Sequence, residues 1–229
     1  MSLQPIASVE RETLGGRVYE DICNHLRSGQ MPPGQVLSLR KMAEAMAVSV
    51  MPVRDAVGRL VAEKALVISK NRTIQVPVLT RAQLRELTAV RIEIEGYAAE
   101  MAAKNHTDAD LDKVTNAALA YEAACKELPP NRRAETMKYN LELHFAIYDA
   151  CHMPSLIDII SSLWLRAGPL IYLGNAGSLE WLETGGSADK HRRAVEAIRD
   201  RKPALARAAI AEDILAAAES VERHVVLAD

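Results

Sequence analysis

The sequence is short of aromatic residues and of cysteine, and each shortage argues against a class of protein. Aromatic residues make up 4% of the 229 residues, with a single phenylalanine. Alanine and leucine recur instead, which favours helices and argues against an all-β sandwich. The three cysteines, Cys23, Cys125 and Cys151, form no CxxC pair, so neither a disulfide scaffold nor a structural zinc ribbon is indicated. We expect them to be small buried residues in a reducing cytosol.

Targeting segments and common catalytic motifs are missing as well. No apolar run approaches the roughly 20 residues that a membrane-spanning helix needs. The first residues also lack the basic and apolar regions of a signal peptide. We therefore expect a cytoplasmic protein with no membrane partner. The chain contains no HExxH, GxSxG or phosphate-binding-loop motif, so it offers little support for hydrolase or nucleotide chemistry.

Two segments of different character meet near Thr80. We expect residues 1–15 to be a flexible tail, residues 16–79 to form a small domain, and residues 80–229 to be all-helical. The net charge of −2 is divided unevenly. Residues 1–80 hold ten basic and seven acidic residues, whereas the remainder holds 18 basic and 23 acidic ones. A basic module joined to an acidic partner fits the electrostatic footprint of a DNA-binding protein.

The N-terminal module has the element order of a winged helix-turn-helix. Helical patterns cover residues 16–28 and 39–46, and a third helix follows Ser49, with Pro52 tolerated in its first turn. Two short β-type runs, at 66–68 and 74–76, are joined by a polar turn in which Asn71 suits a positive φ. This order places the start of the third helix in a DNA major groove, although a small packing domain could show the same pattern.

The run VSVMPVRDAVGRL at 48–60 is preceded by PGQVLS at 33–38 and MAE at 42–44. Together they resemble the N-terminal domain of GntR-family transcription regulators. The resemblance implies a DNA interface at the second helix, the start of the third helix and the wing. Its residues are Arg40, Ser49, Val50, Met51, Arg54, Asn71 and Arg72.

The module departs from the family pattern at two pairs of positions. Val50 and Met51 stand where the family usually has Arg-Thr, and Ala47 and Lys64 stand where it has glycine. Val50 and Met51 cannot make polar contacts with bases, but they could touch a thymine methyl group. We therefore expect an operator sequence that differs from those of relatives.

The second segment reads as six helices at about 81–104, 107–127, 132–152, 154–173, 187–200 and 204–227. The breaks fall at Asn105, Pro129-Pro130, Pro154, a glycine-rich region at 174–186 and Pro203. Short connections of this kind indicate an antiparallel bundle.

Arg91 falls in the apolar row of the first of these helices, with Leu87, Ile94 and Ala98. An arginine that faces a bundle interior needs an anionic partner. That partner is either the carboxylate of a bound ligand or an internal residue such as Glu95, four positions on. Spacing alone does not choose between the two.

Four polar residues lie on the apolar stripes of three helices. Asn140 and His144 share one helix, while His191 and Asp213 belong to two others. If the four converge, two imidazoles and a carboxylate suit a divalent transition metal such as zinc or nickel. The alternative is that each histidine is a core residue with its own hydrogen-bond partner.

The helical segment resembles the all-α FCD effector domain of the FadR subfamily, in its six-helix, VanR-like form. The resemblance implies a metal pocket at Asn140, His144, His191 and Asp213, where the family has an Asp-x-x-x-His pair and two further histidines. Here the first carboxylate is an amide and the last histidine is a carboxylate. The resemblance also implies that Arg91 holds the carboxylate of an effector.

Taken together, these features predict a ligand-responsive transcription regulator. A homodimer would bind a near-palindromic operator in double-stranded DNA. A small organic acid at Arg91, together with a divalent metal, would alter that binding. Two alternatives stay open: a metal-dependent enzyme acting on small carboxylates, and a constitutive DNA-binding protein whose helical domain only dimerises.

Overall fold

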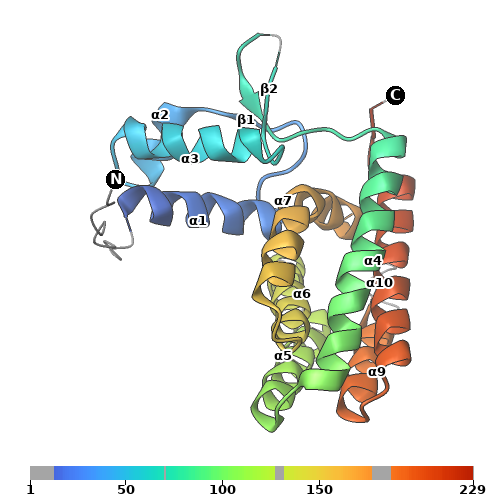
Figure 1. Ribbon diagram of the computed structural model, residues 1–229. Coiled ribbons are helices and arrows are strands. Elements are labelled where there is room, and N and C mark those ends of the chain that lie inside the picture. The colour runs from blue at the N-terminus through green and yellow to red at the C-terminus, as the bar shows by residue number, and fades with distance from the viewer. Residues whose placement is uncertain (1–12, 70, 127–131, 177–186, 229) are drawn as a thin grey trace, which may run out of the picture.

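The computed structural model describes residues 13–69, 71–126, 132–176 and 187–228, which form a small mixed domain followed by a helical bundle (Figure 1). The predicted fold class is therefore confirmed. Residues 1–12 of the expected tail, the Pro129-Pro130 break and most of the glycine-rich region at 174–186 lie outside the described residues.

Three helices and a three-stranded sheet make up the first domain, which we call the reading head. The elements are α1 (Leu14–Arg27), β1 (Val36–Leu37), α2 (Leu39–Ala45), α3 (Val50–Ala62), β2 (Val67–Ile68) and β3 (Ile74–Gln75). Strand β3 lies antiparallel between the other two. The sequence did not predict β1, because two residues are too few to show an alternating pattern. Helix α1 begins two residues earlier than expected, since Thr13 caps it by accepting a bond from the backbone N–H of Gly16.

Several turns of the reading head hold side chains in the left-handed region. Ala47, between α2 and α3, has φ 54°, and Lys64, after α3, has φ 61°. These are the two positions at which family members usually have glycine, and a Cβ atom is strained in this conformation. In the wing turn Arg72 has φ 58°, and the suitability of Asn71 for a positive φ stays a prediction.

Six described helices form the second domain, which we call the helical body. They are α4 (Arg81–Asn105), α5 (Asp108–Lys126), α6 (Arg132–Asp149), α7 (Pro154–Ala176), α9 (Ala188–Arg199) and α10 (Pro203–His224). Helices α4 and α10 run side by side along the length of the body (Figure 1). Helix α7 continues three residues beyond its predicted end, through Gly174.

Each domain has its own apolar core. The reading head is built around Ile22, Leu26 and Leu60, and the body around residues such as Ile147 and Trp164. The three cysteines, all among the described residues, are buried and form no disulfide. Their expected role as small core residues is therefore confirmed.

Helix α7 is the one described helix that is long and apolar enough to cross a membrane by length and composition, over Pro154–Gly174. The expectation that no segment reaches this length was wrong for this helix. Its side chains Ile160, Trp164 and Leu165 are buried in the two cores, and the core helix of a folded protein passes the same test.

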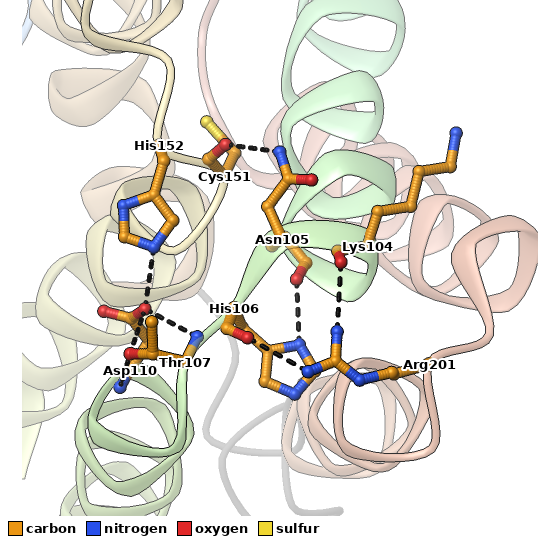
Figure 2. A network of polar contacts seen from close by, with 9 residues as sticks. Lys104, Asn105, His106, Thr107, Asp110, Cys151, His152 and Arg201 are labelled. Atoms are coloured by element: carbon orange, nitrogen blue, oxygen red, sulfur yellow. Dashed lines mark hydrogen bonds and ion pairs between the residues drawn. The ribbon is translucent and has the colours of Figure 1, made fainter.

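At the end of the body remote from the reading head, side chains hold the helix ends together (Figure 2). Arg201 donates hydrogen bonds to the carbonyl groups of Lys104 and His106, at the end of α4 (3.0 and 3.2 Å). His152, from the turn after α6, lies 2.8 Å from Asp110 in the first turn of α5. These contacts join three separate turns and fix where α4 ends.

Candidate functional site: a buried His-His-Asp cluster and an exposed basic face

The predicted DNA-contacting residues lie on the surface of the reading head. Arg40, Ser49, Met51, Arg54, Asn71 and Arg72 are exposed, and Val50 is half-buried. Ser49 occupies the N-cap position of α3, and its side chain makes no capping hydrogen bond. The β2–β3 hairpin projects away from the helical body (Figure 1). This arrangement leaves the start of α3 and the wing open to a DNA groove.

A polar cluster lies inside the helical body, where α6, α9 and α10 meet. His144, His191 and Asp213 are all buried, and one ligand atom from each lies within 4.8 Å of the others. Nε2 of His144 is 3.2 Å from Oδ2 of Asp213, and Nε2 of His191 is 3.5 Å from the same oxygen. The structure therefore brings together three of the four residues that the sequence predicted to converge.

The protonation pattern of this cluster follows from its neighbours. Burial raises the pKa of Tyr148 well above its ordinary value, so the phenol keeps its proton and donates it to Glu95 (2.5 Å). Nδ1 of His144 lies 2.8 Å from the same phenol oxygen, which can then only accept, so Nδ1 carries the imidazole proton. With the proton on Nδ1, Nε2 is the ring nitrogen of His144 that faces Asp213.

His191 and Asp213 complete the cluster. Burial lowers the pKa of His191, and neither of its ring nitrogens makes a hydrogen bond within the part of the chain that the structure describes. Burial raises the pKa of Asp213, but the adjacent histidines outweigh that effect and hold the pKa well below its usual range. Oδ1 of Asp213 has no hydrogen-bond partner among the described residues. The buried carboxylate therefore needs positive charge beside it, either a proton on one of the imidazoles or a metal ion that both rings and the carboxylate bind.

Two of the three separations between ligand atoms match a tetrahedral zinc-like ion. Ligand atoms about 2.1 Å from a tetrahedral ion are roughly 3.4 Å apart, and the two distances to Asp213 are 3.2 and 3.5 Å. Two imidazoles and a carboxylate are typical ligands of a site that keeps one position open for water or a small molecule. His144, His191 and Asp213 therefore have the donors and the spacing to hold a divalent transition metal.

Asn140 lies one helical turn before His144 on α6 and is buried. Residues four apart share a helix face, so Asn140 is on the side of α6 that faces the cluster. Its role as a fourth ligand stays a prediction.

Arg91 is buried on α4 and forms a bidentate ion pair with Glu95. Its Nε and Nη2 atoms donate to the two carboxylate oxygens at 2.6 and 3.1 Å. This is the internal partner that the spacing allowed as an alternative to a ligand. The pair uses two of the five N–H groups of the guanidinium, so an effector-binding role for Arg91 stays a prediction.

Two residues that the sequence did not single out, Tyr148 and Trp164, connect Arg91 to the cluster. Besides Arg91, Glu95 accepts bonds from Tyr148 (2.5 Å) and from the indole N–H of Trp164 (3.0 Å). The ring of Trp164 is also 5.2 Å from that of His144. Tyr148 follows His144 by four residues, a spacing that could have identified it. In the sequence, nothing distinguishes Trp164 from the other residues of an apolar stripe.

A winged helix-turn-helix joined to a separate helical body is an architecture of DNA-binding transcription regulators. The bacterial regulatory protein gntR family model matches residues 14–76, and the FCD domain model matches residues 86–216. The chain belongs to the GntR family of transcription regulators and carries an FCD domain; it is not an enzyme.

Known proteins agree with this assignment over most of the chain. The HTH-type transcriptional regulator McbR of Escherichia coli K12 is 32% identical over 161 residues, which are 70% of this chain and 72% of McbR. The solved structure of E. coli McbR/YncC matches with a TM-score of 0.83 and 25% identity, over 92% of this chain and 98% of that one. A GntR regulator structure from Rhodococcus sp. RHA1 shares the fold, with a TM-score of 0.71 and 18% identity over 91% and 97% of the two chains.

Proposed function

We propose that this regulator is a cytoplasmic homodimer that binds a near-palindromic operator. A divalent cation of the zinc or nickel type and a small organic acid, both bound in the helical body, would change its affinity for DNA. The observation that carries the proposal is the buried His144–His191–Asp213 cluster, in which one nitrogen of each histidine and a carboxylate oxygen lie within 4.8 Å of one another.

The charge of the reading head supports a duplex DNA target. Residues 35–75 contain seven basic and three acidic residues, and phosphate contacts dominate the affinity of DNA-binding proteins. Arg40 and Arg54 would contact the backbone or base edges, while Asn71 and Arg72 would reach the minor groove from the wing. Ser49, Val50 and Met51 would face the bases at the start of α3.

Exposed apolar side chains on α4 and α10 support dimerisation through the helical body. Val90 and Tyr97 on α4 and Leu215 on α10 are 41%, 38% and 48% exposed. The two helices lie side by side, and a symmetric dimer buries the same patch on both copies. Two reading heads held in this way suit an operator with two half-sites.

The effector proposal rests on the open metal position and on Arg91. A carboxylate could complete the coordination of an ion held by His144, His191 and Asp213, with Asn140 as a further ligand. The N–H groups of Arg91 that Glu95 does not use could bind the same acid. An acid that binds one arrangement of the dimer better than another would shift the spacing of the two reading heads.

The metal part of the proposal can be tested by elemental analysis of the purified protein after zinc or nickel is added and excess metal is removed. We expect about one ion per chain, and loss of the ion in His144→Ala and Asp213→Asn. His152→Ala is the matched control, because His152 is exposed and binds Asp110 outside the cluster. A stoichiometry near zero in the wild-type protein would reject the metal site.

The regulatory part can be tested by fluorescence anisotropy with labelled duplex from the intergenic region upstream of the gene. We expect binding that weakens with salt and that responds to metal and to a member of a panel of small organic acids. His144→Ala should bind DNA without this response. A wild-type response to none of these ligands would instead support the constitutive alternative, and equal affinity for random duplex would contradict the operator.

A further inference from the structure

Helix α7 belongs to both domains at adjacent residues. Trp164 lies in the core of the helical body, where its indole N–H bonds to Glu95 and its ring lies against His144. The next residue, Leu165, is 2% exposed and belongs to the core of the reading head. Every other buried member of that core comes from residues 18–76. Two consecutive residues of α7 therefore contact the polar cluster and the core of the domain that carries the DNA interface.

The backbone of α7 also touches the end of α1 directly. A Cβ atom on Gly168 would lie 2.5 Å from the carbonyl oxygen of Leu26 and 2.4 Å from that of Arg27. On the other side of the contact, Gly29 has φ 72°, and a Cβ atom there would lie 2.1 Å from Cβ of Tyr172. Distances this short leave no room for a methyl group, so the two helices can only pack as they do because both positions are glycine. We call this contact the α1–α7 joint.

The helix is weakened at the same place. Pro169 lies inside α7, and it has no N–H to donate to the carbonyl group of Leu165, four residues earlier. A proline inside a helix is a common site of bending. The missing hydrogen bond therefore falls on the residue that enters the core of the reading head.

We propose that the α1–α7 joint is the route by which the cluster in the helical body controls the reading head. A change around His144 or Glu95 moves Trp164, α7 adjusts at Pro169, and Leu165 and Gly168 pass the movement to α1. Helix α1 packs on α3, so the adjustment reaches the helix that faces the DNA groove. This inference rests on the proposed function in taking the metal as the signal, and it makes Trp164, Leu165 and Gly168 positioning residues.

The test is amide hydrogen exchange of the full chain with and without Zn²⁺, followed in α1 and in the helices around the cluster. In the wild-type protein we expect Zn²⁺ to slow exchange in both regions. The slowing in α1 should fall within the roughly 5- to 150-fold range that is usual for allosteric coupling. In Gly168→Ala the slowing around the cluster should remain and the slowing in α1 should be lost. Gly15→Ala is the matched control, because Gly15 lies in α1 and a Cβ atom on it meets nothing within 4 Å.

Two outcomes would overturn the joint as the route. One is Zn²⁺ protection around the cluster with no change in α1 of the wild-type protein. The other is a Gly168→Ala protein that transmits protection as well as Gly15→Ala does.

Hydrogen exchange without metal distinguishes rejection of the α1–α7 joint as the route from rejection of the proposed metal site. If Zn²⁺ changes exchange nowhere, the metal assignment fails, and the joint is judged on Trp164→Phe. This variant removes the bond to Glu95 inside the helical body. The joint predicts faster exchange in α1 of that variant, and unchanged exchange in α1 would reject it.

Discussion

The two domains differ in where their polar residues lie. Among the described residues, every buried polar or charged side chain lies at or beyond Thr88, in the helical body. The core of the reading head consists of hydrophobic side chains, among which Tyr19 donates its hydroxyl proton to Glu63, and Arg40 and Arg54 are exposed. The difference fits the proposed division of tasks, in which the reading head binds DNA outside it and the body binds a ligand that it encloses. Substitutions of charged residues should therefore affect binding in one domain and stability in the other.

The largest effect should come from Arg91→Ala. Removing the arginine leaves the carboxyl group of Glu95 buried without its ion-pair partner, which costs about 3–5 kcal/mol of unfolding free energy. Urea unfolding monitored by circular dichroism measures the loss. Arg91→Met combined with Glu95→Gln is the control, since the glutamine oxygen can still accept from Tyr148 and Trp164, and it should recover most of the stability. A loss below about 1 kcal/mol in the single variant would show that the pair is not effectively buried.

Arg54→Ala should give the complementary result in the reading head. Unfolding free energy should stay within about 0.5 kcal/mol of wild type, while operator affinity falls by roughly 1–3 kcal/mol. Anisotropy titrations over a range of salt concentrations measure both the affinity and the number of phosphate contacts. Arg199→Ala, an exposed arginine of the body, should leave DNA binding unchanged. Equal losses in the two variants would mean that general charge, rather than this interface, carries the binding.

The strained turns of the reading head predict a gain of stability. Ala47→Gly and Lys64→Gly should each raise the unfolding free energy by roughly 0.5–1 kcal/mol, because the positive φ no longer strains a Cβ atom. Ala89→Gly, at an exposed position inside α4, should lower it by about 1 kcal/mol. Thermal unfolding of the three variants compares them directly. Destabilisation by Ala47→Gly would indicate that the turn relies on the alanine in another way.

A smaller effect is expected at the remote end of the body. Hydrogen bonds from the backbone N–H and hydroxyl of Thr107, with a contribution from His152, lower the pKa of Asp110 to about 2. The folded-state pKa is below the ordinary value of 3.8, so this stabilisation is present above about pH 4. It is lost as the pH falls toward 2.

Asp110→Asn should therefore cost less than about 1 kcal/mol at pH 7, and the difference from wild type should shrink below pH 4. Unfolding curves at pH 7 and pH 3 measure this change. Asp112→Asn, at an exposed position in the same helix, should show no such pH dependence. A pH-independent difference would show that the side chain acts through packing rather than charge.

Much of the molecule was predictable because local signals and tertiary structure agree. Apolar periodicity gave the helices, and polar residues on apolar stripes identified three members of the buried cluster. What could not be read depends on contacts between distant parts of the chain. Strand β1 is only two residues long and exists because β3 pairs with it. Trp164 looks like any core tryptophan until Glu95 and His144 are placed beside it. The choice of Glu95 as the partner of Arg91 likewise required the fold.

Leu165 has a consequence for how such regulators can be recombined. The reading head carries the DNA interface, yet one buried side chain of its core is supplied by a helix more than 80 positions further along the sequence. A chimaera that joins residues 14–76 to another FCD domain would inherit whatever side chain the new partner presents at this place. Exchange of domains between relatives would then succeed only when the new helical domain places a compatible side chain at the position of Leu165 in the core of the reading head. The two domains are therefore not freely interchangeable.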